Sequence, residues 1–152
     1  MRIAIVADHN AVPMKARLVD WLAARGHDVD DRGVHDERVV DYPVLCEDLC
    51  RRVLSGAADT GVVLGGSGSG EQMACNKIRG IRAALCHDTF LAGIARGNND
   101  ATVLVMGAKV IAPDAAERIL EVWLDTGFRG GRHHERLAQI AVLERGGSLL
   151  GD

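Results

Sequence analysis

The sequence predicts a three-layer α/β sandwich built on a five-stranded, mostly parallel sheet, and two observations lead to this prediction. First, continuous apolar runs of strand length recur along the chain, as expected for strands buried on both faces of a parallel sheet. Second, segments with apolar residues at helical spacing separate these runs, so strands and helices alternate throughout. Because no repeat or linker interrupts the 152 residues, we expect one domain, residues 1–152.

The expected strands are short and mostly apolar. The first strand ends in Asp8, His9 and Asn10, and polar residues at the carboxyl end of a parallel strand stand where open α/β sheets bind ligands. A polar segment at 27–30 is suited only to a short edge strand. The expected strands are residues 3–7, 27–30, 62–64, 81–86 and 102–106.

The expected helices begin and end at recognised signals. Apolar residues repeat at helical spacing from Met14, and Gly26 closes this first helix. A proline near the first turn opens the second helix at 41–43 and a later one at 113–114. The remaining segments are expected to be a polar loop at 31–40, a helix from 88 to 96, a polar turn at 98–100, a basic hinge at 129–132 and a final helix.

A glycine-rich segment after the third expected strand is the strongest functional signal. Four glycines and two serines occupy residues 65–70, and Glu71 follows where the first turn of a helix is expected. In a strand, glycine loop and helix start, backbone N–H groups converge on an anion, and glycine lets a ligand lie against the main chain. A carboxylate beside such a loop indicates acid–base chemistry on a phosphorylated or enolisable substrate. The alternative is a loop that only turns the chain.

Two nucleotide-binding motifs are absent from this segment. The phosphate loop of nucleotide hydrolases needs Lys-Ser or Lys-Thr after its last glycine, where this chain has Glu71 and Gln72. The dinucleotide fingerprint G-x-G-x-x-G is met at Gly66 and Gly68, but Glu71 replaces the third glycine. A nucleotide-binding module is therefore excluded.

Composition excludes several classes of partner. A net charge of −3 argues against a nucleic-acid or anionic-membrane surface, and no apolar run could span a bilayer. The N-terminus leads into a strand without a signal peptide, and the four cysteines suit reduced thiols, so we expect a cytoplasmic protein. Cys46 and Cys50 are one helical turn apart and could hold a metal, but their apolar neighbours indicate core packing. We therefore expect no metal.

The last expected helix carries a pair of arginines at its start. Arg132 and Arg136 are four residues apart, so both guanidinium groups project from one face. Two forked donors make a good phosphate clamp, although a solvated basic turn is the alternative. A helix beyond a glycine hinge can also contact a second subunit, and it would then deliver these arginines across a dimer interface.

Several short motifs spread over nearly the whole chain carry a specific resemblance. They are Asp8-His9, Asp41-Tyr42-Pro43, Gly66-Ser67-Gly68-Ser69-Gly70, Asn76-Lys77, Gly80-Ile81-Arg82-Ala83, Asn99-Asp100, and Gly130-Gly131-Arg132-His133 with Arg136. With these motifs the chain resembles the sugar-phosphate isomerases typified by ribose-5-phosphate isomerase type B and galactose-6-phosphate isomerase. The resemblance implies a Rossmann-like α/β/α fold, a homodimer with active sites at the interface, and no metal or organic cofactor. Pairing of dimers into tetramers is left open.

The resemblance also implies a mechanism through an enediolate. Some members use a cysteine directly before the glycine loop as the base, and Gly65 stands there; others use a glutamate after the loop, which Glu71 matches. Ser67 and the loop N–H groups would stabilise the enediolate oxygen. The implied substrate-binding residues are Asp8, His9, Gly66, Gly68, Ser69, Gly70, Asn99, Lys109, Arg132 and Arg136.

The chain departs from the family at two positions. Members that open a sugar ring carry a histidine before the residue matching Asn99, and this chain has Asn98 there. Asparagine can hydrogen-bond but cannot shuttle a proton near neutral pH. Lys109 stands where members often have arginine, which keeps the charge and loses the forked geometry.

The missing histidine bears on the choice of substrate. A tetrose 4-phosphate cannot close a furanose ring because the oxygen that would attack the carbonyl is esterified, so it needs no ring opening. We therefore expect an aldose–ketose isomerase that interconverts erythrulose 4-phosphate and erythrose 4-phosphate, with His87, His133 and His134 as other candidates for ring opening. The alternatives are a ribose-5-phosphate isomerase and a catalytically silent sugar-phosphate-binding protein.

Overall fold

The computed structural model describes residues 1–36 and 38–150. Strands and helices alternate as predicted, and every strand pairing is parallel, with the strand order β2-β1-β3-β5-β4. The elements are β1 (Arg2–Ala7), α1 (Val12–Ala24), β2 (Asp28–Asp31), α2 (Tyr42–Leu54), β3 (Thr60–Gly65), α3 (Ser69–Cys75), β4 (Ala83–Leu85), α4 (Thr89–Asn99), β5 (Val103–Gly107), α5 (Pro113–Asp125) and α6 (His133–Glu144). The predicted edge strand is confirmed as β2.

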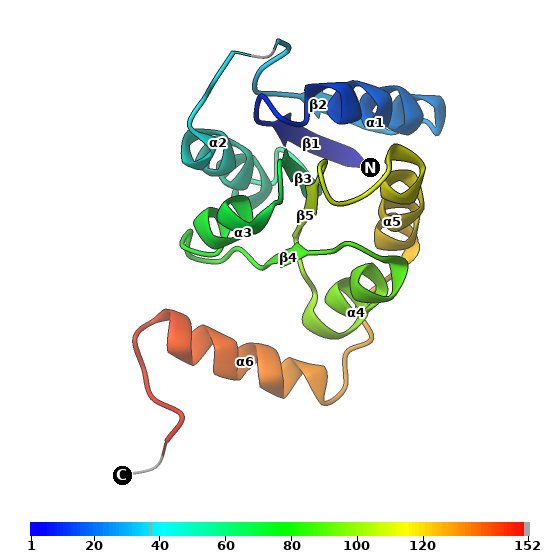
Figure 1. The fold of residues 1–152 in the computed structure, drawn as a ribbon. Coiled ribbons are helices and arrows are strands. Elements are labelled where there is room, and N and C mark those ends of the chain that lie inside the picture. Colours follow the sequence, from blue (N-terminus) through cyan, green and yellow to red (C-terminus); the bar gives the residue numbers. More distant parts are fainter. Residues whose placement is uncertain (37, 151–152) are drawn as a thin grey trace.

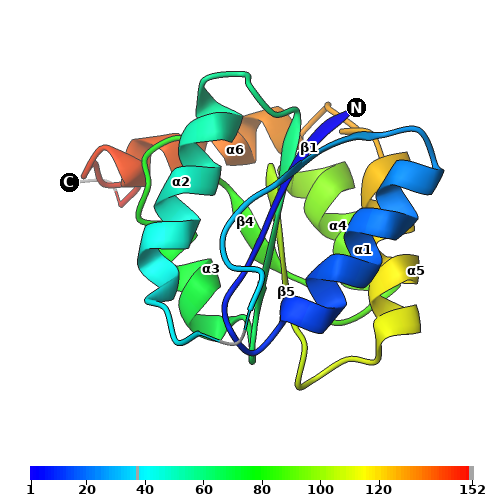
Figure 2. The ribbon, with the colours of Figure 1, turned by 90° about the horizontal axis from the view of Figure 1, so that it is seen from above.

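Helices cover both faces of the sheet, as Figures 1 and 2 show. One face packs against α1, α4 and α5, where Trp123 is almost fully buried and its indole N–H donates to the Thr60 hydroxyl at 3.1 Å. The other face packs against α2 and α3, and Cys46 and Cys50 lie in this second core cluster. Burial of each large apolar side chain contributes about 1.5–3 kcal/mol, which stabilises the three layers. The three-layer α/β/α architecture is therefore confirmed.

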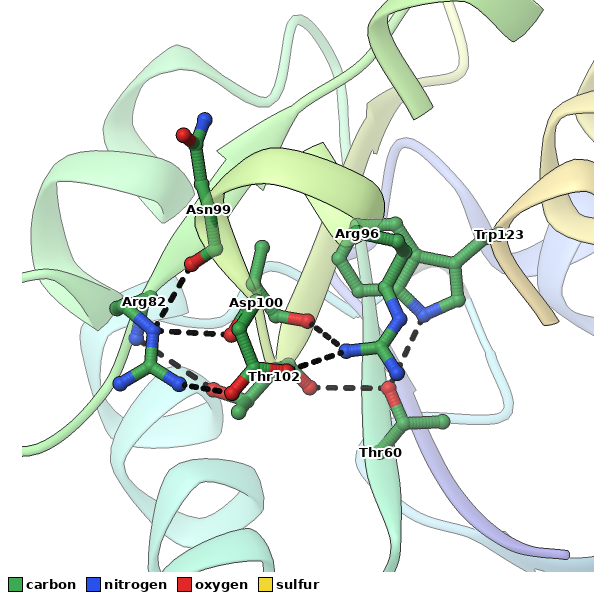
Figure 3. A network of polar contacts seen from close by, with 8 residues as sticks. Thr60, Arg82, Arg96, Asn99, Asp100, Thr102 and Trp123 are labelled. Carbon is green, nitrogen blue, oxygen red and sulfur yellow. Dashed lines mark hydrogen bonds and ion pairs between the residues drawn. The ribbon is translucent and has the colours of Figure 1, made fainter. Parts of the chain in front are cut away.

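The prediction of a polar turn at 98–100 is wrong, because Asn98 and Asn99 form the last turn of α4. The helix ends at Asp100, which adopts a left-handed conformation (φ 43°), and the N–H of the next residue, Ala101, donates to the Ala95 carbonyl at 3.0 Å. Arg82 donates to the carbonyls of Asn99 and Asp100 and to the Asp100 carboxylate (Figure 3). These donors satisfy carbonyls that a helix end leaves without partners, so the helix continues through two asparagines.

Helix α6 differs from the other long helices because none of its residues is buried. Figure 1 shows it beyond β4, at the edge of the sheet farthest from α1 and β2. Ile140 and Leu143 are about half exposed, at 48% and 54%. The Glu144 carboxylate accepts the Gly80 N–H at 2.7 Å, which ties the end of α6 to the body. An apolar helix face is thus left uncovered within one chain.

Across the described residues, no helix is both long and apolar enough to cross a membrane.

Candidate active site

The carboxyl edge of the sheet brings together three segments that are distant in the sequence. Because β1, β3 and β5 are adjacent and parallel, the residues after each strand meet at this edge. Asp8 donates its N–H to the Leu64 carbonyl at 3.0 Å, and Lys109 donates its N–H to the Gly66 carbonyl at 2.9 Å. Of the expected site residues, this edge holds Asp8, His9, Gly66, Ser67, Gly68, Ser69, Gly70, Glu71 and Lys109.

The glycine loop follows a path that only glycine permits at several positions. Gly68 has a φ of 80°, and a side chain there would meet Leu85 at 2.6 Å. Gly107, on the neighbouring strand, lets the Ser67 carbonyl approach to 2.5 Å from where a Cβ would lie. Among the described hydrogen bonds, the N–H groups of Ser67 and Gly68 have no acceptor. These two N–H groups can therefore bind an anionic oxygen.

Glu71 lies in the first turn of α3, as predicted, and is only 5% exposed. A Cβ built on Gly65 would lie 1.9 Å from its Oε1 atom and 2.2 Å from its carboxyl carbon. The carboxylate therefore occupies the space where any side chain at residue 65 would have to lie. Burial raises the pKa of Glu71, and the negative charge of Asp8 raises it further. A carboxylate with a raised pKa is a stronger base.

The buried Asp8 and the half-buried Asn10 form a polar pair beside this carboxylate. Asp8 is 6% exposed and accepts two hydrogen bonds from Asn10, one from the backbone N–H at 2.8 Å and one from the amide at 2.9 Å. The Nδ1 atom of His9 is buried without a described partner, so it remains able to bind a ligand. Asn10 also lies about 3.5 Å from the space above Gly66. The sequence analysis placed Asn10 at the ligand-binding end of the first strand but gave it no role.

Tyr42 is a second residue that the sequence analysis left without a role. Its ring lies 2.6 Å from where a Cβ on Gly70 would stand, so it covers the start of α3. The sequence does contain a signal for Tyr42, because it is the only tyrosine of the chain and directly precedes the proline that opens α2.

The other expected site residues lie at the opposite end of the molecule. Helix α4 runs back from the carboxyl edge, so Asn98 and Asn99 lie at the amino edge, near the start of β5. The five residues of β5 alone span about 13 Å at 3.3 Å per residue. Figure 2 shows α6 at the end of the sheet that holds the N-terminus, away from the loops that lead into α1 and α3. One chain therefore does not bring Asn98, Asn99, Arg132 and Arg136 to Glu71.

In this second group of site residues, the part at the start of α6 is strongly positive. The pKa of His133 is lowered, first by desolvation and then by the charges of Arg136, Arg132 and Arg129, so three guanidinium groups lie near one imidazole. Within residues 1–36 and 38–150, no salt bridge engages any of these three arginines. Uncompensated positive charge of this kind favours binding of an anion such as phosphate.

Comparisons with known proteins agree with these features. Residues 3–140 match the family model described as Ribose/Galactose Isomerase. Ribose-5-phosphate isomerase B of Escherichia coli is 34% identical over 95% of this chain and 97% of its own length. D-erythrulose-4-phosphate isomerase of Pectobacterium atrosepticum is 37% identical over 95% of both chains.

Solved structures give the same result for the fold. Ribose-5-phosphate isomerase B of Clostridium thermocellum superposes with a TM-score of 0.94 at 39% identity and covers 96% of this chain and 99% of its own. The corresponding Thermotoga maritima enzyme superposes with a TM-score of 0.90, also at 39% identity, over 92% of this chain and 97% of its own. The chain therefore belongs to the ribose/galactose isomerase family and is an enzyme of the aldose–ketose isomerase class.

Proposed function

We propose that this enzyme interconverts an aldose phosphate and a ketose phosphate through an enediolate, with Glu71 as the base. Glu71 removes a proton from the carbon beside the carbonyl and returns it to the former carbonyl carbon, while the hydroxyl proton of the first carbon passes to the former carbonyl oxygen. The hydroxyl of Ser67 and the N–H groups of Ser67 and Gly68 stabilise the negative oxygen that develops. The observation that carries this proposal is the position of the buried Glu71 carboxylate in the space above Gly65, beside the glycine loop.

The test of this mechanism is the Glu71→Gln variant. It keeps the shape and removes the proton acceptor, so kcat should fall by about 10²–10⁴-fold while the substrate still binds. The wild-type rate should fall on acidification as Glu71 takes up a proton, with a midpoint above the ordinary glutamate pKa because the pKa of Glu71 is raised. Turnover close to wild type in Glu71→Gln, with the same acid limb, would remove Glu71 from the mechanism.

We further infer that the active site is completed by a second copy of the chain. The basic group at the start of α6 and the asparagines at 98–99 lie too far from Glu71 to act with it in one chain. Among the described residues no strand pairs with the outer edge of β4, and a groove runs along this edge from Gln72 to Asn99. Together with the uncovered face of α6, this edge supports a homodimer, because an open strand edge beside an apolar helix is a ready docking surface.

For the substrate, we propose a tetrose phosphate, interconverted between erythrulose 4-phosphate and erythrose 4-phosphate. The support is Asn98, which cannot move a proton as a ring-opening histidine does and whose amide oxygen already accepts a hydrogen bond from Arg129 at 3.0 Å. Relatives with both substrate names match this chain, so ribose 5-phosphate is the alternative. The family and the buried Glu71 both argue against a catalytically silent binding protein.

A comparison of kcat/KM on erythrulose 4-phosphate and ribose 5-phosphate decides between these substrates. We expect the wild type to have the higher kcat/KM on the tetrose phosphate. The Asn98→His variant should have a higher kcat/KM than the wild type on ribose 5-phosphate but not on the tetrose phosphate. A wild type that prefers ribose 5-phosphate, and does not respond to Asn98→His, would contradict the tetrose proposal. No turnover on either compound, with binding retained, would favour the silent binding protein.

A further inference from the structure

We propose that Arg129 is a third phosphate-binding residue beside Arg132 and Arg136, and that Asn98 is the positioning residue that orients it. This inference rests on the proposed function, because it assigns the phosphate group of the same substrate. Arg129 lies in the connection between α5 and α6, and the sequence indicated it only as part of the basic hinge at 129–132. Three features of the structure support the assignment: its anchoring, its charge and its neighbours.

Arg129 is anchored at both its backbone and its side chain. Its N–H donates to the Gly97 carbonyl at 2.9 Å, and its Nη1 atom donates to the Asn98 Oδ1 atom at 3.0 Å. Between these two contacts the side chain crosses Gly97, where a built Cβ would lie 2.9 Å from Nε and 3.1 Å from the guanidinium carbon. Glycine at this buried helical position therefore leaves room for the arginine. An exposed arginine is thus held in one orientation, which lowers the entropy that binding a ligand would cost.

The group that holds Arg129 leaves its charge intact. Asn98 supplies a neutral amide oxygen, whereas Arg82 and Arg96 nearby are held by the Asp100 carboxylate. An arginine paired with a carboxylate has its charge largely neutralised, but one oriented by an amide stays fully positive. Its other N–H groups have no acceptor among the described residues, so they remain available to a ligand.

The neighbours of Arg129 indicate which ligand it would bind. Arg129, Arg132 and Arg136 all act on the half-buried His133 through their charges. Glu135 also lies in the first turn of α6, but no described salt bridge joins it to these arginines. Three like charges that repel one another are most readily accommodated by a dianion, and a phosphate group accepts hydrogen bonds from several guanidinium groups at once.

The test is a titration of the full-length protein with inorganic phosphate, together with the KM of a phosphorylated substrate. We expect Arg129→Ala to raise both the phosphate dissociation constant and KM about tenfold, with kcat changed by less than about twofold. Asn98→Ala should raise them about threefold, because the charge remains but its orientation is lost. The double variant should match Arg129→Ala alone if Asn98 acts only through Arg129.

Two further variants complete the design. Gly97→Ala should displace the Arg129 side chain and weaken phosphate binding as Asn98→Ala does. Arg145→Ala, which removes an exposed arginine at the other end of α6, is the matched control and should leave the phosphate dissociation constant unchanged. Circular dichroism checks that each variant is folded.

The proposal is overturned if folded Arg129→Ala binds phosphate as the wild type does, or if the losses of Arg129→Ala and Asn98→Ala simply add. Failure of the isomerase proposal would give a different result: no turnover of any aldose phosphate by the wild type. In that case the titration with inorganic phosphate still decides whether Arg129 belongs to an anion site, because it needs no turnover.

Discussion

At the scale of single residues, the site depends on one pair, Gly65 and Glu71. The carboxylate of Glu71 fills the space that a side chain on residue 65 would need, since a Cβ there would lie 1.9 Å from Oε1. The resemblance places a cysteine base at residue 65 in some family members and a glutamate base at residue 71 in others. In this structure the two positions compete for one space, so a side chain at one excludes the carboxylate of the other.

Gly65→Ala tests this competition. The added methyl group must displace the Glu71 carboxylate, and a base misplaced by about 1 Å can cost on the order of 100-fold in rate. We expect kcat to fall by about one to two orders of magnitude. The matched control is Gly93→Ala in α4, whose Cβ would lie 3.6 Å from Val122, an ordinary contact, and which should keep wild-type turnover. Equal activity of the two variants would contradict the assigned position of the base.

At the scale of elements, the C-terminal end of α4 decides where Asn98 and Asn99 lie. Arg82 and Arg96 contact the Asp100 carboxylate at 2.9 and 3.5 Å, and Thr102 accepts further hydrogen bonds through its carbonyl (Figure 3). Because Arg82 directly precedes β4, its contacts hold the end of α4 beside the start of that strand, and the two asparagines lie at the amino edge of the sheet. The position of α4 thus determines that Asn98 and Asn99 are the residues of this helix that the active site of a partner copy could contact.

Asp100→Asn tests the contribution of this helix end to stability. Asparagine tolerates the left-handed conformation, so the change removes mainly the charge that pairs with Arg82 and Arg96. We expect the free energy of unfolding to fall by about 1 kcal/mol, measured by urea denaturation at one protein concentration. Asp114→Asn, which breaks an exposed pair with Arg118 on α5, should cause no measurable change. Similar losses of unfolding free energy in both variants would show that the Asp100 contacts stabilise the protein no more than an exposed ion pair does.

At the scale of the whole molecule, the proposed substrate contacts divide into two groups at opposite ends of one sheet. Glu71 and the glycine loop lie at the carboxyl edge, while the arginines near α6 lie beyond the amino edge (Figure 2). A twofold arrangement would bring the first group of each chain to the second group of its partner. Each dimer would then contain two sites, and each site would need both chains.

Mixing two inactive variants tests this arrangement. Glu71→Gln lacks the base and Arg132→Ala binds the phosphate weakly, so each is expected to have little activity at substrate concentrations well below the wild-type KM, but a mixed dimer contains one site with both wild-type groups. Random exchange of subunits should therefore recover about one quarter of wild-type activity, measured after refolding of a 1:1 mixture. As a control, two batches of Glu71→Gln treated in the same way should recover none. If the mixture also stays inactive while dimers form, both groups must act within one chain.

The order of the elements, the parallel sheet, the glycine loop and the place of Glu71 in the first turn of α3 could all be predicted from the sequence. These features follow from local patterns, since the spacing of apolar residues and glycines depends only on neighbours in the chain. The sequence also predicted Arg132 and Arg136 as a phosphate clamp, which the positive group near α6 supports as a proposal.

The sequence could not predict which distant residues meet, because this depends on how the elements pack. The contact of Glu71 with Gly65, the hydrogen bond of Arg129 to Asn98 and the separation of the two groups of site residues depend on strand order and helix direction. Residues 98–100 show the same limit, because three polar residues favour a turn locally, but arginine donors from the residue before β4 and from α4 satisfy the end of a longer helix. Packing between segments distant in sequence overrides local preference there, and local preference is all that a single sequence reveals.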